Sequence, residues 1–332
     1  IGRFDAAPPS AMAVQAAPMP PAVSTDFTID AALSARAVSV VNEFQVPAFL
    51  IAGDGALQMD SSDLPAPIDA SHDMYAVSRN WSGQMSSANA VQDIVYDAQQ
   101  RAAHIKTLVD ALVSAQYAGL VIDYRGLAEP ARSDFSRFVA ELAAALHKHQ
   151  KKLIVVVPAP IQRGDEWDTA GYDWSVIGSA ADVVQIDAPV DPSAYGSSRR
   201  VEKMLRWAVG AVSRSKLQLA VSASSVKQTG NLFQLVSYDE ALKPWKSITS
   251  SLNLQDVTPG AQVKLSLDNV PNLQFDEALR LYRYTVAASE AATSTLWINT
   301  GAALAQKLNL TPRFGLRGVM VKGLLALGEP LV

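Results

Sequence analysis

Asp123 and Arg125 are the side chains whose chemistry and spacing most clearly indicate a site. They are charged and they come at the end of a run of apolar residues. They lie two residues apart in the segment YAGLVIDYRGL, and residues two apart leave a β-strand on the same face. Val121 shares that face, whereas the other face carries Leu120, Ile122 and Tyr124. A carboxylate beside a guanidinium can form an ion pair, or the guanidinium can bind the carboxylate of a ligand.

A helix and a second apolar strand follow this charged strand end. The strand is predicted over KKLIVVVPAP (residues 151–160). The helix is predicted from apolar residues spaced three and four apart, namely Phe135, Phe138, Val139, Leu142, Ala145 and Leu146. Strand, helix and strand in this order make a βαβ unit with a right-handed crossover. In such folds the functional side chains gather at the C-terminal ends of the strands.

The same alternation of strands and helices extends over most of the chain. Helices are expected over residues 90–115, as one helix or a pair, and over 199–212. Further strands are expected at VPAFLIAG (46–53), MYAVSRNW (74–81), ADVVQIDAPV (181–190) and KLQLAVSASSV (216–226). The sequence therefore predicts an α/β fold, a (β/α)8 TIM-like barrel occupying residues 30–332.

Two segments depart from this alternation. Residues 1–29 are rich in Pro and Ala and are interpreted in one of two ways. They form a linker, or Ile1 to Phe4 are the end of a first barrel strand and the Pro/Ala-rich stretch is the long loop that follows it. Residues 227–295 contain short strand-like pieces and the turn at Pro259-Gly260, which favours a small β-rich insertion before the last barrel strand.

Composition excludes several classes of function. The chain has 332 residues, 49% of them hydrophobic and 18% charged, with a formal net charge of -4. Without a run of lysine or arginine, nucleic acid is not an expected partner. No stretch approaches the roughly twenty apolar residues of a transmembrane helix. The absence of cysteine excludes disulfides and thiolate ligands, and the histidines lie apart from carboxylates, so no metal or cofactor is predicted.

Several segments, taken together and in their order, resemble glycoside hydrolase family 18, the chitinase-like TIM barrels, and in particular its bacterial branch associated with peptidoglycan and spore-cortex hydrolysis. The resemblance covers residues 37 to 330. It rests on SRNW (78–81), GLVIDY (119–124) with KKLIVVVPAP, ADVVQIDAP (181–189), VSYDEAL (236–242), TPGAQVKLSL (258–267) and LWINTGAALAQKLNL (296–310). It implies the barrel fold with its insertion, a glycan as ligand, and export to the cell surface or the extracellular space.

The resemblance also indicates that the family's catalytic motif is degenerate here. The fourth strand of the family carries Asp-Gly-x-Asp-x-Asp-x-Glu, in which the glutamic acid protonates the glycosidic oxygen. In this sequence the three aspartates correspond to Ala118, Val121 and Asp123, and the glutamic acid corresponds to Arg125. A guanidinium stays protonated at working pH, so Arg125 cannot act as the acid. No catalytic residue is therefore predicted.

Two further positions depart from the family's pattern. The sixth strand carries Asp187 where the family has Met-x-Tyr-Asp, and Lys322 replaces the aromatic residue that forms the floor beneath the sugar. One interpretation is a buried ion-pair network in which Asp123 and Asp187 balance Arg125 and Lys322. The other is a ligand site in which Arg125 binds a carboxylate, such as that of a peptidoglycan fragment.

Aromatic and acidic residues after strand ends leave further alternatives open. Trp81, Trp167 and Trp174 could stack on sugars, or they could pack over the core of the barrel. Glu129, Asp165 and Glu166 could be displaced catalytic carboxylates, although charged side chains of solvated loops explain them equally simply.

The sequence thus favours a catalytically inactive barrel that acts as a glycan-binding or scaffold protein at the cell surface. Its expected partners are a chitin-like or peptidoglycan glycan, or other proteins of a surface assembly. The alternative is an active polysaccharide or peptidoglycan hydrolase that uses relocated carboxylates. A structural subunit with a closed cleft is a third possibility. Fold alone does not separate these functions.

Overall fold

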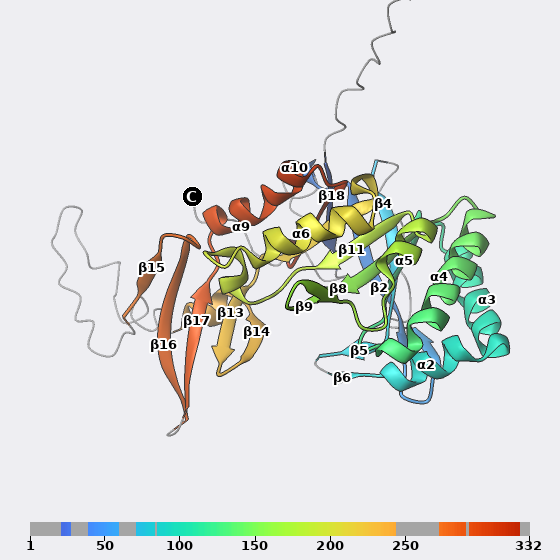
Figure 1. The fold of residues 1–332 in the computed structure, drawn as a ribbon, viewed down its shortest axis with the longest axis horizontal. Coiled ribbons are helices and arrows are strands. Elements are labelled where there is room, and N and C mark those ends of the chain that lie inside the picture. The colour runs from blue at the N-terminus through green and yellow to red at the C-terminus, as the bar shows by residue number, and fades with distance from the viewer. Residues whose placement is uncertain are drawn as a thin grey trace, which may run out of the picture.

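The structure is a computed structural model that describes residues 21–27, 39–59, 71–83, 85–243, 272–289 and 292–325. Within these residues, eight parallel strands form a closed barrel, because β1 pairs with both β2 and β18. The strands are β1 (Ala22–Asp26), β2 (Glu43–Ile51), β4 (Asp73–Arg79), β7 (Gly119–Asp123), β8 (Lys152–Pro158), β11 (Val183–Asp187), β12 (Leu217–Ser222) and β18 (Gly318–Lys322). The predicted (β/α)8 fold is confirmed (Figure 1).

The first barrel strand corrects one predicted boundary. β1 lies at Ala22–Asp26, inside the Pro/Ala-rich segment that was predicted to end at residue 29, so the barrel begins before residue 30. Pairing on both sides fixes β1 as a full member of the sheet, with Thr25 opposite Phe44 of β2 and Val321 of β18. The alternative first strand at Ile1 to Phe4 lies outside the described residues.

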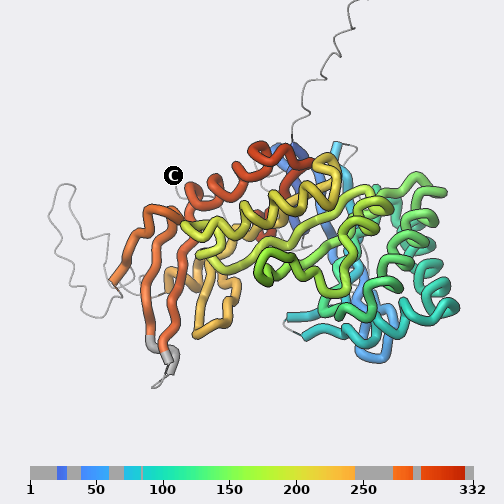
Figure 2. Tube along the Cα trace, in the orientation of Figure 1, coloured from blue at the N-terminus to red at the C-terminus, as the bar shows by residue number. Residues whose placement is uncertain are grey.

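Helices pack on the outside of the barrel between its strands (Figures 1 and 2). The helix predicted over residues 90–115 is a pair, because Asp97 begins a new helix by accepting a hydrogen bond from the Gln100 amide at 2.7 Å. The helices between barrel strands are α2 (Ala88–Tyr96), α3 (Ala98–Ser114), α4 (Arg132–His147), α5 (Trp174–Ala180), α6 (Arg200–Ala211), α9 (Gly301–Leu308) and α10 (Leu310–Phe314), and the short α7 (Tyr238–Ala241) belongs to the insertion. None of the helices in the described residues is long and apolar enough to cross a membrane.

The predicted alternation along β7 is confirmed. Val121 belongs to a buried cluster inside the barrel, with Tyr75, Ile154, Val156 and Val183 from neighbouring strands. The other face of β7 packs against the helices through Leu120, Ile122 and Tyr124. Because side chains alternate along a strand, Asp123 and Arg125 extend the inward face beyond this interior cluster. The charged pair therefore lies at the C-terminal mouth of the barrel.

The predicted β-rich insertion is a second, antiparallel sheet between β12 and β18. Its described strands follow the order β14-β13-β17-β16-β15, and it spans residues 225–298, slightly wider than the predicted 227–295. The strands are β13 (Ser225–Thr229), β14 (Leu232–Val236), β15 (Gln274–Asp276), β16 (Leu281–Ser289) and β17 (Ala292–Ile298). The insertion lies at the opposite end of the molecule from α2, α3 and α4 (Figure 1).

Candidate functional site

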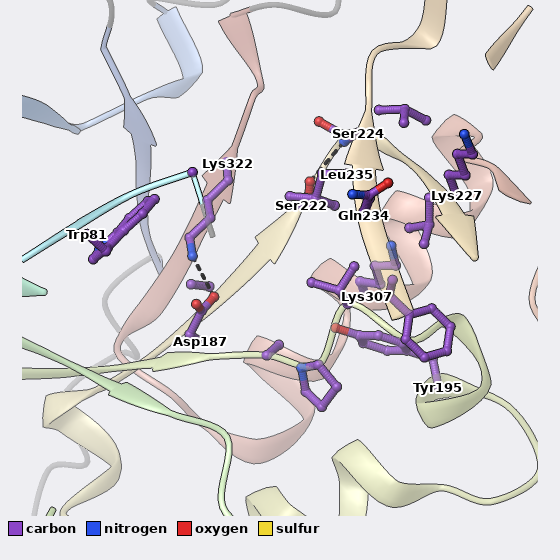
Figure 3. Close-up of a pocket in the computed structure, with 18 of the residues that line it drawn as sticks. Trp81, Asp187, Tyr195, Ser222, Ser224, Lys227, Gln234, Leu235, Lys307 and Lys322 are labelled. Carbon is purple, nitrogen blue, oxygen red and sulfur yellow. Dashed lines mark hydrogen bonds and ion pairs between the residues drawn. The ribbon is translucent and has the colours of Figure 1, made fainter. Parts of the chain in front are cut away.

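An open cleft of about 670 Å³ lies between the C-terminal mouth of the barrel and the insertion (Figure 3). Volumes of this size suit a small-molecule or oligosaccharide ligand. Its polar and aromatic lining comes from strand ends, from the insertion and from helix α9, and includes Trp81, Arg125, Asp187, Tyr195, Ser222, Ser224, Lys227, Gln234, Glu240, Lys307 and Lys322. The cleft is therefore built from parts of the chain far apart in sequence.

The barrel side of the cleft contains the ion pair that the sequence predicted. Arg125 donates from Nε to Asp123 Oδ1 and from Nη2 to Asp123 Oδ2, each at 2.9 Å. This parallel arrangement matches the planar guanidinium to the planar carboxylate. Asp123 is only 7% exposed, so its charge is neutralised by Arg125 rather than by water.

Two more charged residues extend this pair into a network of four. Arg125 Nη2 lies 3.4 Å from Asp187 Oδ2, and Lys322 Nζ lies 2.5 Å from Asp187 Oδ1. Asp187 ends β11 and Lys322 ends β18, so barrel closure brings them to the tip of β7. The network contains two cations and two carboxylates, so it is neutral in total. Of the two interpretations of these residues, the ion-pair network describes their arrangement.

Arg125 is held in place by contacts besides those with carboxylates. Its guanidinium lies over the ring of Trp81, with Cζ 3.8 Å from the ring centroid. Asn80 accepts a hydrogen bond from the Arg125 amide at 2.7 Å and donates to the Arg125 carbonyl at 3.0 Å. Asn80 is fully buried, so its sequon, Asn80-Trp81-Ser82, serves this hydrogen bonding rather than glycosylation.

The electrostatics of the network keep Arg125 charged. Burial by itself would lower its pKa, but the hydrogen bonds to Asp123 and the charges of Asp123 and Asp187 raise the pKa of Arg125 above its ordinary value. A group that stays protonated throughout cannot exchange a proton with a substrate. The tip of β7 is therefore a fixed positive charge.

The other predicted tryptophans lie outside the cleft lining. Trp174 is only 2% exposed, and its ring lies 5.0 Å from that of Trp207 on α6. Trp167 stacks on the same Trp207 with ring centroids 6.0 Å apart. Both pack against the hydrophobic core, so for these two residues packing replaces the alternative of sugar stacking. Trp81 alone of the three lines the cleft.

The predicted relocated carboxylates are also absent from the lining of the cleft. Glu129 borders a separate, shallow depression beside α4, and Asp165 and Glu166 are exposed at the β9–β10 hairpin (Ile161–Arg163 and Glu166–Asp168). Asp187 and Glu240 are the carboxylates that the described part of the chain contributes to the cleft lining. Of these, Asp187 is already paired with Arg125 and Lys322.

Two of the histidines, His104 and His147, take structural positions in this fold. His104 is buried beneath β7, where its Nε2 lies 2.8 Å from the Tyr124 hydroxyl, and burial lowers its pKa to about 4. His147 lies 2.9 Å from Asp182 at the end of α4. Among the described residues, no group of three His, Asp or Glu side chains is close enough to hold a metal ion.

The insertion side of the cleft contains residues that the sequence did not single out. Lys307 extends from α9, Tyr195 from the turn η2 (Pro192–Tyr195), and Lys227, Gln234 and Glu240 from the insertion. Figure 3 shows Lys307 beside Tyr195 on the side of the cleft away from Trp81. No local pattern marks these residues, because each is one polar side chain among many. Of these residues, only Lys227, Gln234 and Glu240 lie in the predicted insertion.

Comparison with solved structures places the fold among known barrels. No family model and no curated protein sequence matches the chain. A chitinase from Chromobacterium violaceum ATCC 12472 is 22% identical, with a TM-score of 0.65 over 91% of this chain and 93% of that one. The spore cortex-lytic enzyme SleL of Bacillus megaterium QM B1551 is 14% identical, with a TM-score of 0.64 over 91% and 70%.

A third solved structure shows the same likeness. The Group IV chitinase of Ostrinia furnacalis is 12% identical, with a TM-score of 0.65 over 91% of this chain and 92% of that one. The chain therefore has a glycoside hydrolase family 18-like fold, a closed barrel shared with chitinases and spore cortex-lytic enzymes. At these identities the likeness defines the fold, and the function has to be argued from the site.

Proposed function

We propose that this protein is a catalytically inactive glycan-binding protein built on a chitinase-like barrel. The observation that carries the proposal is the position of Arg125 at the tip of β7, where it is paired with Asp123 and Asp187 beside an open cleft. Hydrolysis of a glycosidic bond needs a carboxylic acid that protonates the leaving oxygen. The tip of β7 offers a guanidinium instead, and this supports binding without turnover.

The open cleft favours glycan binding over a purely structural subunit. The charge network neutralises one side of the cleft without filling it, because about 670 Å³ remains open beside Arg125 and Lys322. Trp81 is partly exposed at the cleft beside the Arg125 guanidinium that lies over its ring, and Ser222 and Gln234 offer hydrogen-bonding groups. An aromatic surface with a few polar groups is the usual composition of a sugar-sized site.

Solved structures with the same fold include chitinases and spore cortex-lytic enzymes, and this supports a chitin-like or peptidoglycan ligand. Export to the cell surface or the extracellular space belongs to the same proposal, since such glycans are found there. Other proteins of a surface assembly are a second class of partner that an inactive scaffold would contact.

The test is a paired assay of binding and of reducing-end release with chitin oligomers and peptidoglycan, on the native protein and on Asp123→Ala and Arg125→Ala. Binding without release is the expected result for the native protein. Release that is lost in Asp123→Ala would show an active hydrolase and overturn the proposal. If neither binding nor release is detected, the glycan-binding role is wrong and a structural role takes its place.

A further inference from the structure

The two sides of the cleft differ in how their positive charges are compensated. On the barrel side, Arg125 and Lys322 are both paired with carboxylates. On the insertion side, Lys307 has no hydrogen-bond or ion-pair partner among the described residues, and its ammonium lies over the ring of Tyr195 at 5.3 Å from the centroid. A half-buried cation beside an open cleft is thus left for a ligand to neutralise.

We propose that Lys307 binds a carboxylate of the glycan, so that the ligand of this cleft is an acidic oligosaccharide rather than a neutral one. This inference rests on the proposed function, because it names the class of glycan that the same cleft binds. Lys307 and Tyr195 lie across the cleft from Trp81 (Figure 3), so one sugar would contact Trp81 while an acidic neighbour reaches Lys307.

The surroundings of Lys307 favour an anionic group over a neutral one. Burial lowers the pKa of Lys307 to about 8, which means that the protein by itself only weakly supports the charged form. A ligand carboxylate within hydrogen-bond distance would restore that support. Arg125 is a poorer carboxylate receptor, because Asp123 already occupies two of its N–H groups.

Two chemical sources of the carboxylate are distinguished by three probes of equal length. The first is an oligosaccharide of alternating N-acetylglucosamine and N-acetylmuramic acid with free lactyl carboxylates. The second is a chitin oligomer, its neutral counterpart, and the third is an oligogalacturonate. The native protein should bind one acidic probe about tenfold or more tightly than the chitin oligomer, as expected for one charge-assisted hydrogen bond. The preferred acidic probe identifies the source.

Lys307→Met keeps most of the length of the side chain and removes its charge, so it should lower the affinity for the acidic probe to that for the chitin oligomer and abolish the preference. Lys203→Met is the matched control, because Lys203 is exposed on α6 outside the cleft, and it should retain the preference. Equal affinities for acidic and neutral probes in the native protein would overturn the inference and leave the proposed function standing. An equal loss of affinity for the acidic and the neutral probe in Lys307→Met would also overturn the inference.

A pH profile of the native protein tests the inference independently of any folding defect in Lys307→Met. Sugar carboxylates stay ionised above about pH 6, whereas Lys307 loses its proton near pH 8. The acidic-probe preference should fall as the pH rises through 8. The other titratable groups that line the cleft are Arg125, Asp187, Tyr195, Lys227, Glu240 and Lys322.

Lys307→Arg separates Lys307 from those groups. Its guanidinium stays charged through this range, so the preference should persist above pH 8 in this variant and fall in the native protein. A preference that falls equally in both proteins would assign the titration to another group and overturn the inference. Absence of binding to all three probes would overturn the proposed function itself, and the inference with it.

Discussion

The two ends of the barrel contain ion pairs of the same type in different surroundings. At the N-terminal end, Arg317 pairs with Glu43, whose side chain is 6% exposed and also accepts a hydrogen bond from Ser24 at 2.6 Å. At the C-terminal end, Arg125 pairs with Asp123 and Asp187, and its side chain is 36% exposed to the cleft. One pair is closed within the protein, whereas the other borders open space.

This difference shows where the fold stabilises itself and where it can bind a ligand. The interior beyond Glu43 continues with polar side chains that satisfy one another, such as Gln45, which donates to Gln185 at 2.7 Å. Removing one member of such an enclosed pair leaves an uncompensated buried charge, which strongly destabilises the fold. Charges beside the cleft can instead exchange a protein partner for water or a ligand. This agrees with the general division of such barrels into a stabilising and a functional end.

The largest expected effect is on the N-terminal pair. Arg317→Met should lower the free energy of unfolding by about 3–5 kcal/mol, because Glu43 would remain buried without its cation. Urea denaturation measures the change. In the double variant Glu43→Gln with Arg317→Met, much of the stability should return. A loss below about 1 kcal/mol in the single variant would contradict the contrast between the two ends.

His104, which is buried against Tyr124 on the outward side of the barrel, gives a pH-dependent test of stability. The pKa of His104 falls from 6.5 to about 4 on burial, so the unfolded chain binds a proton that the folded protein does not bind between these values. Protonation of His104 in the unfolded chain therefore does not affect the free energy of unfolding above about pH 6.5. As the pH falls from there towards 4, it lowers the free energy of unfolding by about 3 kcal/mol.

Urea denaturation of the native protein and of His104→Gln, at several pH values between 4 and 7, isolates this contribution. The native protein should lose more stability than the variant across that range. Parallel pH profiles would show that His104 does not titrate in this way, and that the acid sensitivity comes from other groups.

The C-terminal network should respond more weakly than the N-terminal pair. Asp123→Asn removes the carboxylate that binds Arg125 twice, yet Arg125 keeps Asp187 at 3.4 Å and contact with the cleft. The free energy of unfolding should fall by about 1–2 kcal/mol. A loss as large as that of Arg317→Met would mean that both ends serve stability alike, and would remove the distinction between them.

The smallest effect concerns binding. Trp81→Ala should weaken chitin-oligomer binding about tenfold, because it removes the aromatic surface of the cleft, and leave the fold intact. Trp167→Ala is the control, since Trp167 lies outside the cleft lining and should keep native affinity. Isothermal titration calorimetry measures both. Equal weakening in the two variants would mean that sugars bind elsewhere.

Much of the fold could be predicted from local sequence patterns. Apolar runs such as LIVVVP and the helical spacing from Phe135 to Leu146 depend on neighbours within a few residues. The strand at Ala22–Asp26 is not predicted by local pattern, because AVSTD is short and follows a Pro/Ala-rich stretch, so its strand character depends on pairing with β2 and β18. Pairing with its neighbours in the sheet, and not the intrinsic strand propensity of these residues, makes this segment a strand.

The candidate site divides in the same way. An ion-pair network of Asp123, Arg125, Asp187 and Lys322 was one of two interpretations of the sequence. Two of these residues lie on one strand face, and the family resemblance assigned the others to further barrel strands. The sequence left Trp167 and Trp174 undecided, because packing against Trp207 is a contact between separate elements. Lys307 passed unnoticed because burial, and not its neighbours in sequence, distinguishes it from the other lysines.

The sequence by itself determined the order of the barrel strands from β2 to β12, the alternation along β7 and the absence of cysteine chemistry. Only the tertiary structure decided which charges meet, since Asp187 and Lys322 are 135 residues apart. It also left the cleft open between the barrel and the insertion. The physical reason is range: periodicity records contacts within an element, whereas closure of the barrel brings together strand ends that share no local pattern.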